Sequence, residues 1–134
     1  MTLCKNRGMK NTTITATGIP RANTYVPAVQ ITAPERLLFV SGQIPETIDG
    51  QVPHDFASQC RLAWNNILTA LEGADMGLEN LVKVTIYLSD RRYRDENAAI
   101  RDEFMGQHKI ALTVVIVGIY ESRWLLEIEA VAAG

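Results

Sequence analysis

The feature that most constrains the fold of this chain is an alternation of side chains near its C-terminus. The stretch WLLEIEAVA, Trp124 to Ala132, repeats with a period of two, which is typical of a β-strand with one buried face. One side of this strand would carry Leu126, Ile128 and Ala130, and the other Leu125, Glu127, Glu129 and Val131. The two carboxylates would lie about 7 Å apart. They are either solvated on an open sheet face, which the pattern alone favours because glutamate is seldom buried without a partner, or they line a cleft and perform acid–base chemistry.

Length and composition predict one globular domain that does not bind nucleic acid. The chain has 134 residues, of which 47% are apolar and 21% charged, and its net charge is −2. Such a charge does not attract a phosphate backbone. Residues 1–11 are polar and patternless and are expected to form a flexible tail, with Met1 or Met9 as the start, and residues 12–134 a single domain. We find no segment suited to a membrane span or a secretory signal, and we expect a cytoplasmic protein with reduced Cys4 and Cys60.

Periodicity and turn residues predict six strands and two helices in the order β-β-β-α-β-α-β-β. The second helix would bury Tyr93, Asn97, Ile100 and Phe104, and would expose its charged residues, Arg101 among them. This order predicts an α/β (α+β) domain in which one open mixed sheet carries both helices on one face. The expected elements are strands at Thr12–Thr17, Tyr25–Ile31, Leu37–Val40, Leu81–Leu88, Ile110–Val117 and Trp124–Ala132, and helices at Asp55–Gly73 and from Asp90 to about Phe104.

Two of the predicted strands are apolar on both faces, although helices can cover only one of them. These strands are Leu37–Val40 and Ile110–Val117. An uncovered apolar sheet face is unfavourable in water, so we expect it to pack against other copies of the chain. The sequence therefore predicts an obligate oligomer.

Ser41, Gly42 and Gln43 follow the first of these buried strands. Gly42 permits a close approach of the backbone, and Ser41 places a hydroxyl at a strand end, where functional loops gather. The same residues also suit an ordinary turn, which the pattern slightly favours.

Several segments together resemble the Rid (YjgF) family of reactive-intermediate deaminases. They are LLFVSGQIP (Leu37–Pro45), the helix that begins near Asp55, VKVTIYLSD (Val82–Asp90) and LLEIEAVA (Leu125–Ala132), and they occur in the family's order from about Tyr25 onward. The resemblance implies a chorismate-mutase-like fold and a homotrimer whose sheets form a central barrel, with small-molecule clefts between subunits. It also implies hydrolysis of imine or enamine acids without a cofactor.

Individual positions carry over from this resemblance. Tyr25 matches the tyrosine of the family's cleft and Ser41 its site serine. Glu127, the first acid of EIEA, matches the glutamate credited with positioning or activating water. Glu127 could act as a proton donor or a base, or could be a structural acceptor for backbone N–H groups.

The chain departs from the family at the residues that bind the substrate carboxylate. Where the deaminases have Pro-Ala-Arg-Ser/Thr, this chain has Ile110-Ala111-Leu112-Thr113, so Leu112 replaces the arginine, and Val114 replaces a frequent cysteine. The Gly-Pro that usually precedes the tyrosine is Asn23-Thr24 here. A leucine cannot form the bidentate, charge-assisted pair that offsets desolvation of a carboxylate. Either another cation does so, with Arg36, Lys109 and Arg123 as candidates, or the ligand presents an apolar group there.

These observations leave two functions from different classes. The first is a Rid-type hydrolase for an imine or enamine larger or more apolar than 2-aminoacrylate, in which backbone N–H groups near Thr113 and Val114 help to polarise the ligand. The second is a non-catalytic trimeric protein that binds a small ligand or has a regulatory role. A ribonuclease fits poorly with an acidic chain. His54 and His108 lack neighbouring ligands at metal-binding spacing, so we expect no metal site.

Overall fold

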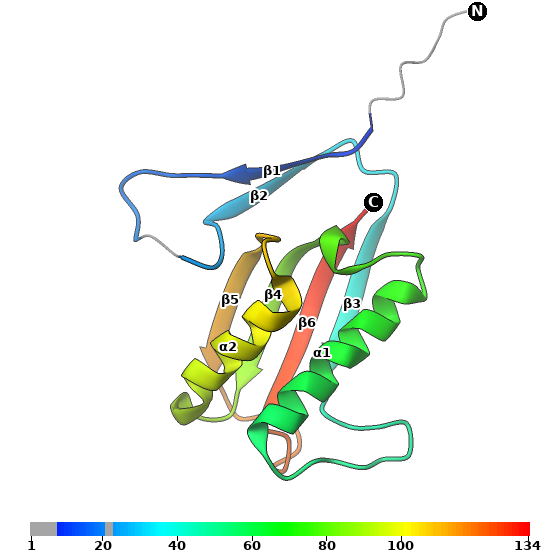
Figure 1. Cartoon of the computed structure of the whole chain (residues 1–134), viewed down its shortest axis with the longest axis vertical. Coiled ribbons are helices and arrows are strands. Elements are labelled where there is room, and N and C mark those ends of the chain that lie inside the picture. The colour runs from blue at the N-terminus through cyan, green and yellow to red at the C-terminus, as the bar shows by residue number, and fades with distance from the viewer. Residues whose placement is uncertain (1–7, 21–22) are drawn as a thin grey trace, which may run out of the picture.

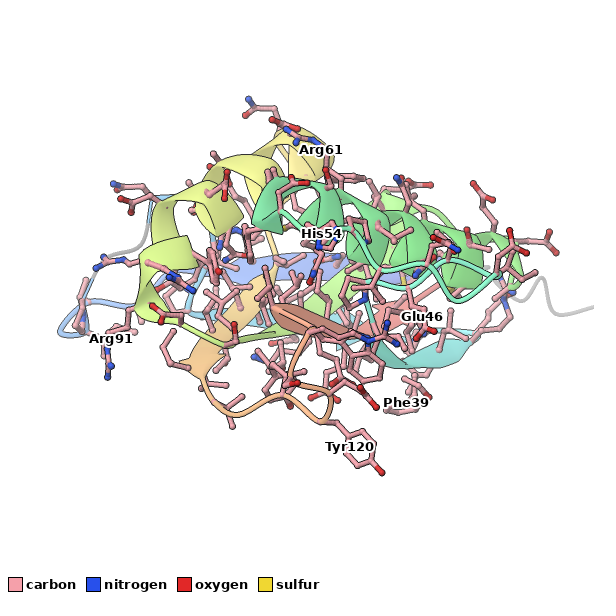
Figure 2. The ribbon with its side chains drawn as sticks, turned by 90° about the horizontal axis from the view of Figure 1, so that it is seen from below. Phe39, Glu46, His54, Arg61, Arg91 and Tyr120 are labelled. Carbon is pink, nitrogen blue, oxygen red and sulfur yellow. The ribbon has the colours of Figure 1, made fainter. Side chains whose placement is uncertain are left out.

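The main sheet has four strands in the order β3-β6-β4-β5, and both helices lie on one of its faces (Figures 1 and 2). The structure is a computed structural model that describes residues 8–20 and 23–134. Within this part of the chain no helix is long and apolar enough to cross a membrane. The elements are β1 (Lys10–Ile14), β2 (Ala28–Thr32), β3 (Leu37–Gln43), α1 (Phe56–Glu72), η1 (Leu78–Asn80), β4 (Leu81–Leu88), η2 (Arg91–Tyr93), α2 (Arg94–Met105), β5 (Ala111–Ile116) and β6 (Leu126–Ala133).

The C-terminal strand β6 occupies the interior of this sheet. It pairs antiparallel with β3 on one side and with β4 on the other. β4 and β5 form a parallel pair joined by α2. β3 and β4, which α1 connects, are also parallel, and β6 lies between these two strands. The predicted mixed sheet with two helices on one face is therefore confirmed.

The first two strands differ from the expectation of one continuous sheet. β1 and β2 pair antiparallel with each other in a separate two-stranded sheet, which extends past the end of the main sheet in Figure 1. The chain turns at Ala33, whose φ is 53°, and this turn directs β2 and β3 into different sheets. β1 begins at Lys10, inside the segment expected to be a tail, and residues 1–7, with Cys4, lie outside the described part.

Apolar stripes on the helices form the core with the alternate residues of β4 and β6. The apolar stripe of α1 is buried, with Trp64, Ile67 and Leu71 fully inaccessible. Each such side chain contributes about 1.5–3 kcal/mol of transfer free energy. Asp55 is the N-cap of α1, and its Oδ2 accepts a hydrogen bond from Ser58 N at 2.9 Å. This hydrogen bond is the main cause of the lowered pKa of Asp55.

Arg101 contradicts the prediction for the solvated side of α2. Its residue surface is only 6% exposed, and its Nη2 donates to Thr24 Oγ1 at 3.0 Å. Thr24 lies 77 positions before Arg101 in the chain, in the segment that precedes β2. Helical periodicity identifies the face toward the sheet, but it cannot reveal that a distant loop covers another face.

The face of the main sheet opposite the helices remains apolar and open in the single chain. Phe39 is 74% exposed and Leu37 is 54% exposed. In Figure 2 Phe39 points away from the side on which the helices lie. Val115 shares this face, since it pairs with Tyr87 across the parallel strands β4 and β5. The uncovered face predicted from the sequence is therefore present.

Cys60 offers a test of the core. The side chain is fully inaccessible, and burial raises the pKa of its thiol from 9.0 to about 12. A shift of this size lowers the thiolate fraction at pH 8 by roughly a thousandfold. In a Cys4→Ser variant, we expect a thiol reagent to label Cys60 only at the rate of unfolding, and fast labelling of the native protein would contradict this packing.

Candidate functional site

The two glutamates of β6 lie on the sheet face opposite the helices and have different surroundings. Leu126, Ile128, Ala130 and Ala132 are buried toward the helices, so the alternation directs Glu127 and Glu129 to the other side. Glu129 Oε1 accepts a hydrogen bond from Tyr87 Oη at 2.5 Å, and this bond is the main cause of the raised pKa of Tyr87. Glu129 thus has a structural partner on β4.

Glu127 packs against the glycine of the SGQ segment. A Cβ atom built on Gly42 would overlap the Glu127 side chain, lying 2.9 Å from its Cδ and 3.1 Å from its Cγ. The pairing of β3 with β6 shifts register between Val40 and Gln43, so Gly42 lies at a bulge. Two of the segments that carry the family resemblance, LLFVSGQIP and LLEIEAVA, are therefore in contact, and a side chain at position 42 would displace the carboxylate of Glu127.

A cavity of about 320 Å³ opens beside this contact. Its lining includes Gly42 and Glu127, and Tyr120 at its margin is 91% exposed. Figure 2 shows Tyr120 projecting from the same side of the molecule as Phe39. The lining residues are Gly42, Tyr87, Val117, Gly118, Ile119, Tyr120, Glu127 and Glu129.

Lys83 adds a cation to the same sheet face. Its Nζ donates to Thr113 Oγ1 at 2.7 Å, so the Thr113 side chain is engaged on the helix-free face. Burial lowers the pKa of Lys83, and the charge of Glu129 opposes this shift. A smaller cavity of about 220 Å³ brings Lys83 and Glu129 together with Phe39.

Tyr25, Leu112 and Val114 meet in a different cavity, of about 330 Å³, beside α2. Its lining consists of Tyr25, Arg94, Asn97, Ala98, Arg101, Leu112 and Val114. Val26 N donates to Ile110 O at 3.1 Å and forms a parallel bridge with Ala111, which fixes Tyr25 next to the start of β5. Tyr25 and Leu112 therefore lie at the same cavity within one chain.

The predicted site residues accordingly fall into separate groups. Glu127 lies at one cavity, Tyr25, Leu112 and Val114 line another, and Thr113 bonds to Lys83 between them on the sheet. Ser41 is exposed and lines neither of these cavities. In a single chain these residues do not form one site.

The cations considered as substitutes for the missing arginine do not line the Leu112 cavity. Arg36 Nη1 donates to Ala74 O at 2.6 Å, and Arg123 is paired loosely with Glu121 at 3.9 Å. Lys109 lines another cavity, near β1. Arg101 and Arg94 line the Leu112 cavity instead, and both were assigned to the solvent-exposed face of the second helix. One sequence feature could have pointed to this cavity: Asn97, one turn before Arg101, is a polar residue in the apolar stripe of the helix.

The histidines and acids form no cluster suited to a metal ion in the described residues. His108 Nε2 lies 2.7 Å from Leu81 O, and this contact ties the end of α2 to the start of β4.

Comparisons with known proteins identify the family of this chain. The family described as Endoribonuclease L-PSP matches residues 15–134. HMF1 of Saccharomyces cerevisiae is 32% identical over 84% of this chain and 85% of its own. The 2-iminobutanoate/2-iminopropanoate deaminase of Escherichia coli is 30% identical over 81% of this chain and 85% of its own. This chain belongs to the Rid (YjgF) family.

A solved structure supports the fold. YyfB from Yersinia pestis, described as a member of the conserved Rid family, superposes with a TM-score of 0.81 at 19% identity and covers 92% of this chain and 98% of its own. The fold of this Rid protein is therefore the chorismate-mutase-like fold that the sequence resemblance implied.

The contact between Gly42 and Glu127 can be tested by a double-mutant cycle. Gly42→Ala should destabilise the protein by up to about 1 kcal/mol, because the glutamate side chain must move away from the new methyl group. In a Glu127→Ala background, where Cγ and Cδ are absent, the same change should cost much less. Urea unfolding of the four proteins measures the coupling, and an equal cost in both backgrounds would refute the contact.

Proposed function

We propose that this Rid protein is a hydrolase that converts an imine or enamine acid to a keto acid and ammonia in a cleft between two subunits. The observation that carries this proposal is the division of the site. A carboxylate at an open cavity and a separate ligand-sized cavity lie on different parts of one chain, so a complete site needs a second copy. The name of the Escherichia coli relative, a 2-iminobutanoate/2-iminopropanoate deaminase, supports the reaction class.

The proposed assembly is a homotrimer with the helix-free faces turned inward. Phe39 and Leu37 expose large apolar surfaces on this face, and burying them against other copies is favourable. Glu127 is on the same face, so the assembly would bring it to a subunit boundary. The Tyr25 and Leu112 cavity of one subunit would then meet Glu127 of the next, with Ser41, Thr113 and Val114 around the ligand.

The chemistry requires water and a group that exchanges protons. Water adds to the carbon of the C=N bond while Glu127 accepts one of its protons and passes it to the nitrogen, which gives a carbinolamine. Glu127 then transfers the hydroxyl proton of the carbinolamine to the amino group, the C–N bond breaks, and ammonia leaves as the C–O bond becomes a carbonyl. The carbon keeps its oxidation level, so hydrolysis needs no redox cofactor. Leu112 favours a substrate with an apolar side chain larger than that of 2-aminoacrylate, since it offers a methyl surface where an arginine would offer a charge.

The assembly predicts a defined mass in solution. Three copies of the 14.9 kDa chain should sediment at about 45 kDa. Phe39→Glu should give monomers, because a charge would be buried in each interface. Ile48→Glu is the matched control, since Ile48 is fully exposed outside the sheet, and it should remain trimeric. Analytical ultracentrifugation of the three proteins would overturn the proposed interface if Phe39→Glu kept the wild-type mass.

The activity can be tested with imines generated in situ by an amino-acid oxidase. The leucine-derived imine should disappear faster with enzyme than in buffer, and by a larger factor than the alanine-derived imine. Glu127→Gln should reduce the enzymatic rate by roughly 10²–10⁴-fold, because the amide cannot exchange the proton. Trapping of the remaining imine as its semicarbazone measures the rates.

A second function, a non-catalytic ligand-binding protein, is favoured by the loss of the arginine at Leu112. It predicts that Glu127→Gln changes the affinity for ligands and that wild type gives no acceleration over buffer. The same measurements therefore separate the two functions.

A further inference from the structure

The cavity beside α2 has an unusual balance of charge and apolar surface. Its apolar wall is formed by Leu112, Val114 and Ala98, and its ionised lining residues are Arg94 and Arg101. No carboxylate belongs to the lining within the described part of the chain. A volume of about 330 Å³ is at the small end of ordinary ligand sites. The cavity is therefore electropositive, ligand-sized and largely apolar.

Arg101 is a buried cation whose ion pair in the described part of the chain is loose. Its Nη2 bonds to a neutral hydroxyl, that of Thr24, at 3.0 Å. The nearest carboxylate oxygen among the described residues, Asp102 Oδ1, is 3.7 Å from Nε, which is too far for a hydrogen bond, and that side chain is 45% exposed. A guanidinium has five N–H donors, and burial of its charge is costly without an anion. An anion in the cavity would offset this cost.

Asn97 provides an independent observation at the same place. The residue is only 2% exposed, and its Oδ1 has no hydrogen-bond partner among the described residues. Buried acceptors without partners are uncommon in folded proteins, since each costs roughly 1–3 kcal/mol. Asn97 and Arg101 are four positions apart on α2, so their side chains share one face of the helix. Because Oδ1 is inaccessible to solvent in the single chain, a ligand with an anionic group and an adjacent N–H or O–H donor would satisfy both residues once the Asn97 side chain turned toward the cavity.

We propose that Arg101 replaces the family's missing arginine from the opposite wall of the cleft and binds the carboxylate of the ligand. Asn97 Oδ1 accepts a hydrogen bond from the neighbouring N–H or O–H group, and the apolar side chain of the ligand lies against Leu112 and Val114. The ligand class is an amino- or imino-type acid with an aliphatic side chain. This inference refines the proposed function by naming its substrate class, but carboxylate binding can be measured without turnover.

The test compares two stable probes by calorimetry on the full-length protein in its native oligomeric state. The first is the 2-hydroxy acid derived from leucine, which carries a carboxylate, an O–H donor and an aliphatic side chain. The second is the uncharged primary amide of that acid. Wild type should bind the acid at least about tenfold more tightly than the amide, as expected for charge-assisted hydrogen bonds. Equal affinities, or no binding of the acid, would overturn the inference.

Variants separate anion binding from a structural role of Arg101. Arg101→Met should abolish the preference for the acid, and Arg101→Lys should retain part of it. Thr24→Val removes the hydroxyl that Arg101 contacts, and it should keep the preference. Arg91→Met, an exposed arginine outside the cavity, is the matched control and should behave as wild type. If Thr24→Val and Arg101→Met lose the preference alike, Arg101 only anchors the Thr24 segment.

A further variant covers the case in which Arg101→Met does not fold. Asn97→Asp keeps the side-chain shape and places a negative charge one helical turn from Arg101. It should remove or reverse the preference for the acid over the amide, and an unchanged preference would contradict the proposal.

The outcomes also distinguish this inference from the proposed reaction. If wild type prefers the acid but does not accelerate imine hydrolysis, the hydrolase function fails and the carboxylate site stands. If Glu127-dependent hydrolysis of the leucine-derived imine is undiminished in Arg101→Met at low substrate concentration, the hydrolase stands and the role of Arg101 is wrong.

Discussion

The packing of one side of β6 against the helices is the constraint on which the rest of this structure depends. β6 lies between β3 and β4, and its alternate residues from Leu126 to Ala132 are buried in the core. A slip of one residue would move two glutamates into that core and four apolar side chains out of it. The register is therefore strongly fixed, and it places Glu127 and Glu129 on the open face. Tyr87 then engages Glu129, and the bulge at Gly42 leaves room for Glu127.

The same constraint separates the parts of the candidate site. Leu112 and Val114 lie on the α2 side of β5, whereas Thr113 bonds to Lys83 on the other face, because neighbouring residues of a strand point in opposite directions. Glu127 and Leu112 consequently line different cavities of one chain. In the proposed trimer, both features have the same origin. Burying the apolar sheet face of each subunit against other copies would bring the Glu127 cavity of one subunit next to the Leu112 cavity of another.

The cavity beside α2 shows how a binding group can move while the fold stays the same. Leu112 stands at the position that the sequence resemblance assigns to the arginine of the deaminases, and Arg101 reaches the same cavity from the helix. This exchange would keep a positive charge in the cleft but change which wall is charged and which is apolar. A relocated cation selects a different arrangement of carboxylate and side chain in the ligand, so specificity can change without any change in β6 or in Glu127.

The sequence alone determined the secondary structure of the core, the mixed sheet with its one-sided helices and the family. These features depend on local periodicity, turn residues and several segments read in order, all of which are properties of neighbouring residues. It also predicted the helix-free apolar face. Tertiary structure decided what depends on distant segments: the separate β1–β2 sheet, the contact of Glu127 with Gly42, and the burial of Arg101 under Thr24. A helical pattern records only the face turned toward the sheet, so the cation of this cavity could not be recognised before the loop that covers it was placed.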